Sequence, residues 1–93
     1  MIQSFVDKAT ARVFARERVR KFGPKLQRVA QKRLLILDAA EALEDLKVPA
    51  GNRLEKLKGN RAGQYSIRVN DQWRICFRWS QSNVHDVEIV DYH

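Results

Sequence analysis

Apolar and polar residues alternate with a period of two in the second half of the chain, which is typical of β-strands. The apolar residues of "WRICFRW" (residues 73–79) share one face of such a strand: Trp73, Ile75, Phe77 and Trp79. The opposite face carries Arg74, Cys76 and Arg78. The pattern therefore predicts a strand with one face in the core and one cationic face.

Neighbouring segments repeat this alternation. "QYSIRV" precedes the strand and "VHDVEIVDYH" follows it, with "ND" and "SQSN" as the turns between them. We expect these segments to form a three-stranded antiparallel meander. The short alternation "IQSF" near the N-terminus predicts one more strand, which pairs at an edge of the sheet.

The first half of the chain has a helical period. Apolar residues recur at helical spacing from Pro24 to about Leu46, and Pro24 suits the first position of a helix. "VPAGN" contains the helix breakers that end this segment. Asp7 can cap a shorter helix that runs to about Arg20.

These elements predict an α+β fold, in which N-terminal helices pack on one face of a small antiparallel sheet. Residues 1–93 should form a single domain. The one cysteine cannot form an internal disulfide, so packing must hold the fold, and a cytoplasmic location is expected. No apolar run approaches the roughly 18 to 20 residues of a membrane span, so no membrane partner is expected.

The net charge of +7 makes a polyanion the first partner to consider. The charge is unevenly distributed, because residues 8–33 hold ten of the 18 Lys and Arg and one acid. Residues 84–93 hold three acids and no Lys or Arg. The basic half is therefore expected to attract phosphate, unless its long side chains only solvate exposed helix faces.

Several kinds of catalytic site are disfavoured. The two histidines, His85 and His93, have no second cysteine and no metal-binding spacing, so no metal and no cofactor are expected. Cys76 lies in mid-strand between two arginines, which indicates a packing residue more than a nucleophile. "LKGNRAGQ" lacks the ending of a phosphate-binding loop.

RNA cleavage without a metal remains open to charged side chains. A base must remove the 2′-OH proton, cations must stabilise the charge at phosphorus, and an acid must protonate the leaving 5′-oxygen. His93 titrates near neutrality and can act as acid or base, although a terminal residue can equally be a frayed chain end. On a strand, Asp91 and His93 share one face while Tyr92 points to the other, so the three act together only if the strand twists or frays at its end.

A longer motif carries a family resemblance. "LEKLKGNRAGQYSIRVNDQWRICFRW", followed by the ending "VEIVDYH", resembles the HigB branch of the RelE/ParE toxin superfamily, and the resemblance covers the whole chain. It implies a small α+β toxin of a type II toxin–antitoxin system. It further implies a ribosome-dependent, metal-independent endoribonuclease that cleaves mRNA in the A site and stops translation.

By position in the motif, the resemblance implies an active site of Lys58, Arg74, Asp91, Tyr92 and His93. Some members of this branch carry a histidine where this chain has Glu55. We therefore expect Glu55 and His93 to form the acid/base pair, with the assignment of the base left open. Lys58 and Arg74 would stabilise the phosphorane, and Tyr92 would stack on a base.

The substitution at Glu55 also affects the expected rate. A carboxylate near Lys58 should stay ionised and donate a proton poorly, which predicts slower or differently pH-dependent cleavage. Further arginines are expected to bind RNA phosphates without taking part in the chemical step: Arg61, Arg68 and Arg78.

Two other functions remain open. ParE-type relatives share the fold and poison DNA gyrase through protein contacts without nuclease activity. A non-catalytic RNA-binding module is the third possibility, and it needs no acid/base residues. The ending "DYH" and Arg74 favour the nuclease over the gyrase poison, because a gyrase poison has no evident need for an acid/base set.

The resemblance also implies partners. A separate helix-turn-helix antitoxin of the HigA type should bind the toxin and contact operator DNA, so that the toxin meets this DNA only indirectly. The small ribosomal subunit and its mRNA would be the targets. The basic residues of 8–33 are expected to contact ribosomal RNA more than the cleaved phosphate.

Overall fold

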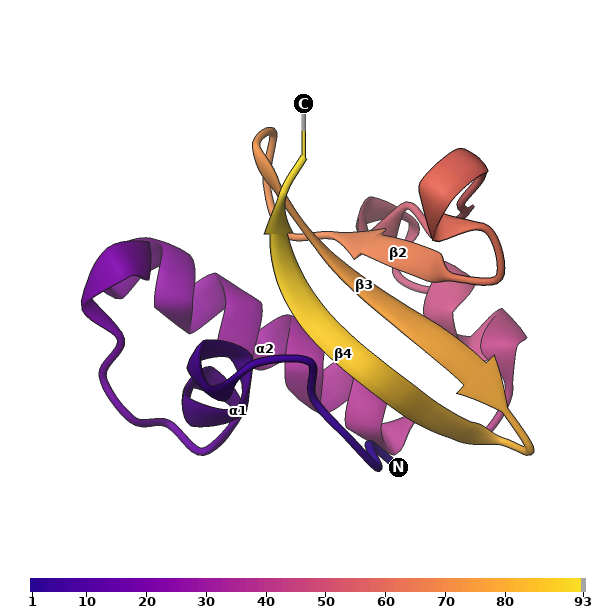
Figure 1. Ribbon diagram of the computed structural model, residues 1–93, viewed down its shortest axis with the longest axis horizontal. Helices are drawn as coiled ribbons and strands as arrows, with labels where there is room; N and C mark the ends of the chain where they lie inside the picture. The colour runs from indigo at the N-terminus through magenta and orange to yellow at the C-terminus, as the bar shows by residue number, and fades with distance from the viewer. Residues whose placement is uncertain (93) are drawn as a thin grey trace.

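A computed structural model describes residues 1–92 and shows two layers (Figure 1). The helical layer consists of α1 (Lys8–Phe14) and α2 (Pro24–Ala39). Both helices pack on one face of an antiparallel four-stranded sheet. This arrangement confirms the predicted α+β fold, with N-terminal helices on one face of a small sheet.

The sheet has the strand order β1-β2-β3-β4, with every neighbouring pair antiparallel. Its strands are β1 (Glu55–Lys56), β2 (Tyr65–Arg68), β3 (Trp73–Ser80) and β4 (Asn83–Asp91). The last three form the predicted meander. β1 was not predicted from the sequence, because a strand of two residues is too short to show an alternation.

The N-terminal segment lies along the edge of β4 (Figure 1). It makes two isolated parallel bridges, Ile2 with Val84 and Phe5 with Val87, so the predicted edge position is correct but the continuous strand is not. Between these bridges, Asp86 has a φ of 53°, and the pairing of β3 with β4 shifts register near this residue. This bulge in β4 interrupts a regular ladder on its outer edge.

Helix α1 begins as predicted and ends early. The Asp7 carboxylate accepts a hydrogen bond from the backbone N–H of Thr10 at 2.8 Å, which caps the first turn. The predicted end at Arg20 is wrong, because the helix stops at Phe14 and Arg16 adopts a φ of 65°. A short 3₁₀ turn, η1 (Arg20–Phe22), then leads to α2.

Helix α2 starts at Pro24 as predicted but ends at Ala39, so the expected end at Leu46 is also wrong. The Asp45 carboxylate accepts hydrogen bonds from the backbone N–H groups of Glu41 and Ala42, each at 3.0 Å. These bonds lower the pKa of Asp45 and start a separate 3₁₀ turn, η2 (Leu43–Lys47). Local capping therefore outweighs the helical apolar period.

The core lies between α2 and the inner face of the sheet. Its largest fully buried apolar side chains come from both layers: Val13, Leu34, Leu37, Leu46, Ile67, Ile75, Phe77, Val84 and Val87. Trp73 and Trp79 pack against this core from the two ends of β3. The predicted apolar face of this strand is therefore correct. No helix among residues 1–92 combines the length and apolar character needed to cross a membrane.

Candidate active site

One row of residues crosses the open face of the sheet, away from the helices. Glu55 pairs with Ser66, Ser66 with Cys76, and Cys76 with Glu88. Directly paired residues of antiparallel strands point to the same face, so all four side chains share the open face. Ser66 and Cys76 are nevertheless completely buried. Other side chains must therefore cover the middle of this row.

Two arginines supply that cover. A nitrogen of Arg74 lies 3.6 Å from the Glu55 carboxylate, and a nitrogen of Arg61 lies 3.4 Å from the Glu88 carboxylate. We call Glu55, Arg61, Arg74 and Glu88 the charged cluster. It places two guanidinium groups and two carboxylates over a neutral floor of serine and cysteine.

Arg74 is the most tightly held member of the charged cluster. Its Nε donates to the Ser66 hydroxyl at 2.7 Å, and its Nη2 donates to the Arg53 carbonyl at 2.6 Å. Only 11% of its side chain is exposed. These bonds fix the plane of the guanidinium. Within residues 1–92, Nη1 makes no such bond, so its two N–H groups remain available for a ligand.

The last residue of β4, Asp91, and the residue after it, Tyr92, lie on different faces of the sheet. The Tyr92 ring lies 5.8 Å from the Arg74 guanidinium, on the open face. Asp91 pairs with Trp73, on the other face, and its carboxylate accepts a hydrogen bond from the Gln72 amide at 3.0 Å. The backbone N–H of Tyr92 donates to the Gln72 carbonyl at 2.7 Å, which ties the chain to the β2–β3 turn (Figure 1).

The structure thus brings both Tyr92 and Glu55 to Arg74, while Asp91 stays on the opposite side, as strand alternation predicts. The sixth predicted catalytic residue, His93, lies outside the described residues. Lys58 lies on the loop after β1, where its backbone precedes the 3₁₀ turn η4 (Gly59–Arg61). Its exposed side chain makes no hydrogen bond or ion pair with the described part of the chain.

The predicted RNA-binding arginines are all engaged by acids. Arg61 pairs with Glu88, Arg68 with Asp71, and Arg78 with Asp86 at 3.5 Å. Gly63 lies against Arg78, because a Cβ added at that position would come within 2.9 Å of its Nη1. The charges of these three arginines are therefore balanced by carboxylates. The expectation that the arginines of the open face simply face solvent or a ligand is incomplete.

Sequence reasoning missed the acids and acceptors that organise this face. Ser66 and the Arg53 carbonyl orient Arg74, and Glu88 holds Arg61. For Ser66 and Glu88 a signal existed, because both lie on polar positions of predicted strands. The role of Arg53 had no signal in the sequence, because Arg74 binds its backbone carbonyl, a group that every residue has.

His85 pairs with Arg78 across β3 and β4, beyond the bulge that separates it from the charged cluster. Within residues 1–92, no group of three or more His, Cys, Asp and Glu could hold a metal ion.

Cys76 is expected to react slowly with thiol reagents. Burial raises the pKa of its thiol, with Glu88 and Glu55 adding to the rise while Arg61 and Arg74 oppose it. Disulfide-exchange labelling of the native protein at pH 8 should be about 100-fold slower than labelling in urea, because the reagent needs a local opening. Lowering the pH from 8 should slow labelling in both states, because the thiolate is the reactive species. Equal rates in the two states would contradict the buried position.

The chain can also be compared with known proteins. Residues 3–93 match the family described as the RelE-like toxin of the type II toxin–antitoxin system HigB. The chain belongs to the HigB-like toxin family. The resemblance in its sequence motif is thereby confirmed.

Individual relatives of this toxin agree with that assignment. The chain is 56% identical to Toxin HigB-1 of Vibrio cholerae serotype O1 over 48 residues, which are 52% of this chain and 50% of the relative. It is 34% identical to Endoribonuclease HigB of Proteus vulgaris over 61 residues, which are 66% of this chain and 65% of the relative. The matches span half to just under two thirds of these curated relatives.

Solved structures support the fold of the toxin. The heterotetrameric YoeB–YefM toxin–antitoxin complex of Staphylococcus aureus contains a chain with a TM-score of 0.62 and 18% identity. The match covers 100% of this chain and 98% of that one. A second YoeB–YefM complex of the same organism gives a TM-score of 0.59 at 17% identity, with the same coverage. At these identities the likeness concerns the fold alone.

Proposed function

We propose that this toxin is a ribosome-dependent endoribonuclease that cleaves mRNA in the A site and so stops translation. The fixed guanidinium of Arg74 carries the proposal, because it lies 3.6 Å from a carboxylate and 5.8 Å from an aromatic ring. Metal-free RNA cleavage needs a cation and two proton-transfer groups, and the ring adds a surface on which an unpaired base can stack. The relative named Endoribonuclease HigB supports the same activity.

The proposed reaction is an internal transfer at phosphorus. A base removes the 2′-OH proton, the 2′-oxygen attacks phosphorus, and the 5′-oxygen leaves with a proton from an acid, which gives a 2′,3′-cyclic phosphate. We assign the two proton transfers to Glu55 and His93. Arg74 contacts a non-bridging oxygen through Nη1, and Lys58 adds a second positive charge. On a regular strand His93 would share the face of Asp91, opposite Arg74, so its role requires the chain end to depart from strand alternation. We assign Asp91 an orienting role at this chain end.

The surroundings of the site suit an unpaired nucleotide. Tyr92 offers its ring on the same face as Arg74, so a base can stack on it while the adjoining phosphate reaches the guanidinium. Arg61, Arg68 and Arg78 can contact flanking phosphates by exchanging their carboxylate partners for the ligand. Each such exchange costs an ion pair, so these contacts should add modest affinity.

Partners follow from the proposed activity and the family. We propose the ribosome and its mRNA as targets, in the cytoplasm, and a helix-turn-helix antitoxin of the HigA type as the inhibitor. The antitoxin would also bring the toxin to operator DNA. No metal or cofactor is needed for the proposed step.

A purified translation system tests the activity against the gyrase alternative. Added toxin should stop protein synthesis and shorten the mRNA, while DNA gyrase continues to supercoil a plasmid at the same toxin concentration. Intact mRNA together with arrested supercoiling would overturn the proposal in favour of a ParE-like inhibitor.

Glu55→Gln should slow single-turnover cleavage about 100-fold or more, because general acid/base catalysis typically contributes about 100- to 10,000-fold. The Glu55 side chain is 54% exposed, so losing its ion pair should change stability by less than about 1 kcal/mol. Glu44→Gln removes an exposed carboxylate on η2 and serves as the control. An unchanged rate in Glu55→Gln would leave Glu55 with a structural role only.

A further inference from the structure

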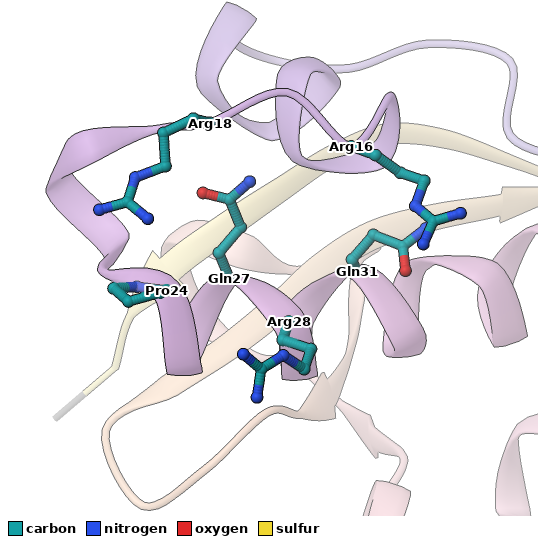
Figure 2. Close-up of a pocket in the computed structure, with 6 residues that line it drawn as sticks. All are labelled: Arg16, Arg18, Pro24, Gln27, Arg28 and Gln31. Atoms are coloured by element: carbon teal, nitrogen blue, oxygen red, sulfur yellow. The ribbon is translucent and has the colours of Figure 1, made fainter.

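A basic hollow of about 270 Å³ opens in the helical layer, remote in sequence from the charged cluster. It lies between the α1–α2 loop and the first half of α2 (Figure 2). Its lining is three arginines, two glutamines and one proline: Arg16, Arg18, Pro24, Gln27, Arg28 and Gln31. We call this hollow the arginine pocket.

Gln27 holds the loop that forms the pocket wall. Its side-chain oxygen accepts a hydrogen bond from the Val19 backbone N–H at 2.8 Å, and its side-chain nitrogen donates to the Glu17 carbonyl at 2.5 Å. Val19 itself is buried in the core. Figure 2 shows Arg16 and Arg18 on the loop, on either side of Gln27. The backbone carrying these two arginines is therefore anchored to α2.

The arginines of the pocket differ from those of the sheet in their partners. Arg61, Arg68, Arg74 and Arg78 each contact a carboxylate. Within residues 1–92, the guanidinium groups of the pocket arginines make no ion pair and no hydrogen bond. Their charges are exposed, and only one acid occurs in residues 8–33.

The charge of the whole chain shows the same division. Residues 8–33 hold ten of the 18 basic residues, which leaves eight for the rest of the chain together with ten of its 11 acids. The positive charge that attracts a polyanion therefore resides in the helical layer. The N-terminal turn of α2, which begins at Pro24, also borders the pocket. The helix dipole favours an anion at this end of the helix.

We propose that the arginine pocket binds a backbone phosphate of structured RNA and so docks the toxin before cleavage. Guanidinium groups match phosphate oxygens in geometry and charge, and phosphate contacts dominate the affinity of proteins for nucleic acid. A protein partner would need apolar anchors at its centre, which this lining of arginines and glutamines does not provide. Since α1 and α2 cover the opposite face of the sheet from the charged cluster, docking and cleavage engage different surfaces (Figure 1).

This inference rests on the proposed function for its RNA, and two paired variants test it separately. Arg18→Gln with Arg28→Gln removes two charges from the pocket. Lys8→Gln with Lys47→Gln removes two exposed charges from outside it. The probe is a short fluorescein-labelled RNA duplex, and its anisotropy gives the affinity at several salt concentrations.

The pocket pair should weaken duplex binding about tenfold and reduce the salt slope by about one to two units, because the slope falls by about one unit for each phosphate that the protein no longer neutralises. The Lys8/Lys47 pair should change both quantities less. Equal effects of the two pairs would overturn the proposal, because diffuse charge would then explain the binding. A pocket pair that binds the duplex normally but no longer binds the antitoxin would overturn it in favour of an acidic protein segment.

Cleavage of ribosome-bound mRNA gives the second readout. The pocket pair should require more ribosomes for half-maximal cleavage and keep the same rate at saturation. A lower rate at saturation would contradict a docking role. If the unaltered toxin cleaved no mRNA, the proposed nuclease would fail, but the difference in duplex affinity between the two pairs would still support the pocket.

Discussion

Arg74→Ala should reduce single-turnover mRNA cleavage about 100- to 1,000-fold, which is the usual cost of removing one preorganised donor to a developing charge. The guanidinium is already oriented by Ser66 and by the Arg53 carbonyl, so the toxin spends little energy on placing it when substrate binds. Cleavage of programmed ribosomes by a saturating excess of toxin measures the chemical step directly.

Arg74→Lys is the matched variant for this prediction. It keeps the positive charge but not the planar fork that bonds to Ser66 and Arg53, so it should restore only part of the rate. Urea unfolding of both variants distinguishes the removal of a donor from the loss of the fold. A normal rate in a folded Arg74→Ala would remove Arg74 from the reaction.

Phe77→Ala should lower the free energy of unfolding by about 3 to 5 kcal/mol. Phe77 is completely buried in the middle of β3, and its ring stacks against that of Tyr65 at a centroid distance of 6.1 Å. A small domain has only about 5 to 15 kcal/mol in total, so this variant should lie near its stability limit.

The midpoint of urea unfolding measures this destabilisation. Phe77→Leu fills much of the cavity and should cost less, while Val6→Ala, at a side chain 55% exposed, should change stability by at most about 0.5 kcal/mol. If Phe77→Ala unfolded at the same urea concentration as Val6→Ala, the core would not be centred on β3.

The faces of the sheet were predictable because they depend on local alternation. The pattern of "WRICFRW" separates Ile75 and Phe77 from Arg74 regardless of what the neighbouring strands do. The same rule places Asp91 and Tyr92 on opposite sides, which the structure confirms. The family motif added the position of Glu55, which the two-residue β1 could not reveal by its pattern.

Features set by contacts distant in sequence were not predictable. The end of α2 depends on the Asp45 carboxylate capping the turn that follows. The partners of the sheet arginines depend on cross-strand register, which the bulge at Asp86 shifts. The sequence therefore showed a row of positive charges, and only the fold showed that acids balance them.

This balance suggests that the charged cluster and the arginine pocket have different roles in the toxin. The charged cluster pairs each guanidinium with a carboxylate, which suits proton transfer and charge stabilisation at one phosphate more than long-range attraction. The arginine pocket keeps its charges exposed, which suits attraction of a polyanion. Raising the salt concentration should therefore weaken docking well before it slows the chemical step.

Cleavage that requires the ribosome and uses Arg74 is the central claim. The most direct test adds the toxin to ribosomes paused with a known A-site codon, beside the same mRNA alone, and maps the new 5′ ends. We expect cuts within the A-site codon only when the ribosome is present, and their absence in Arg74→Ala. Equal cutting of free mRNA, or A-site cuts that persist in a folded Arg74→Ala, would contradict this claim.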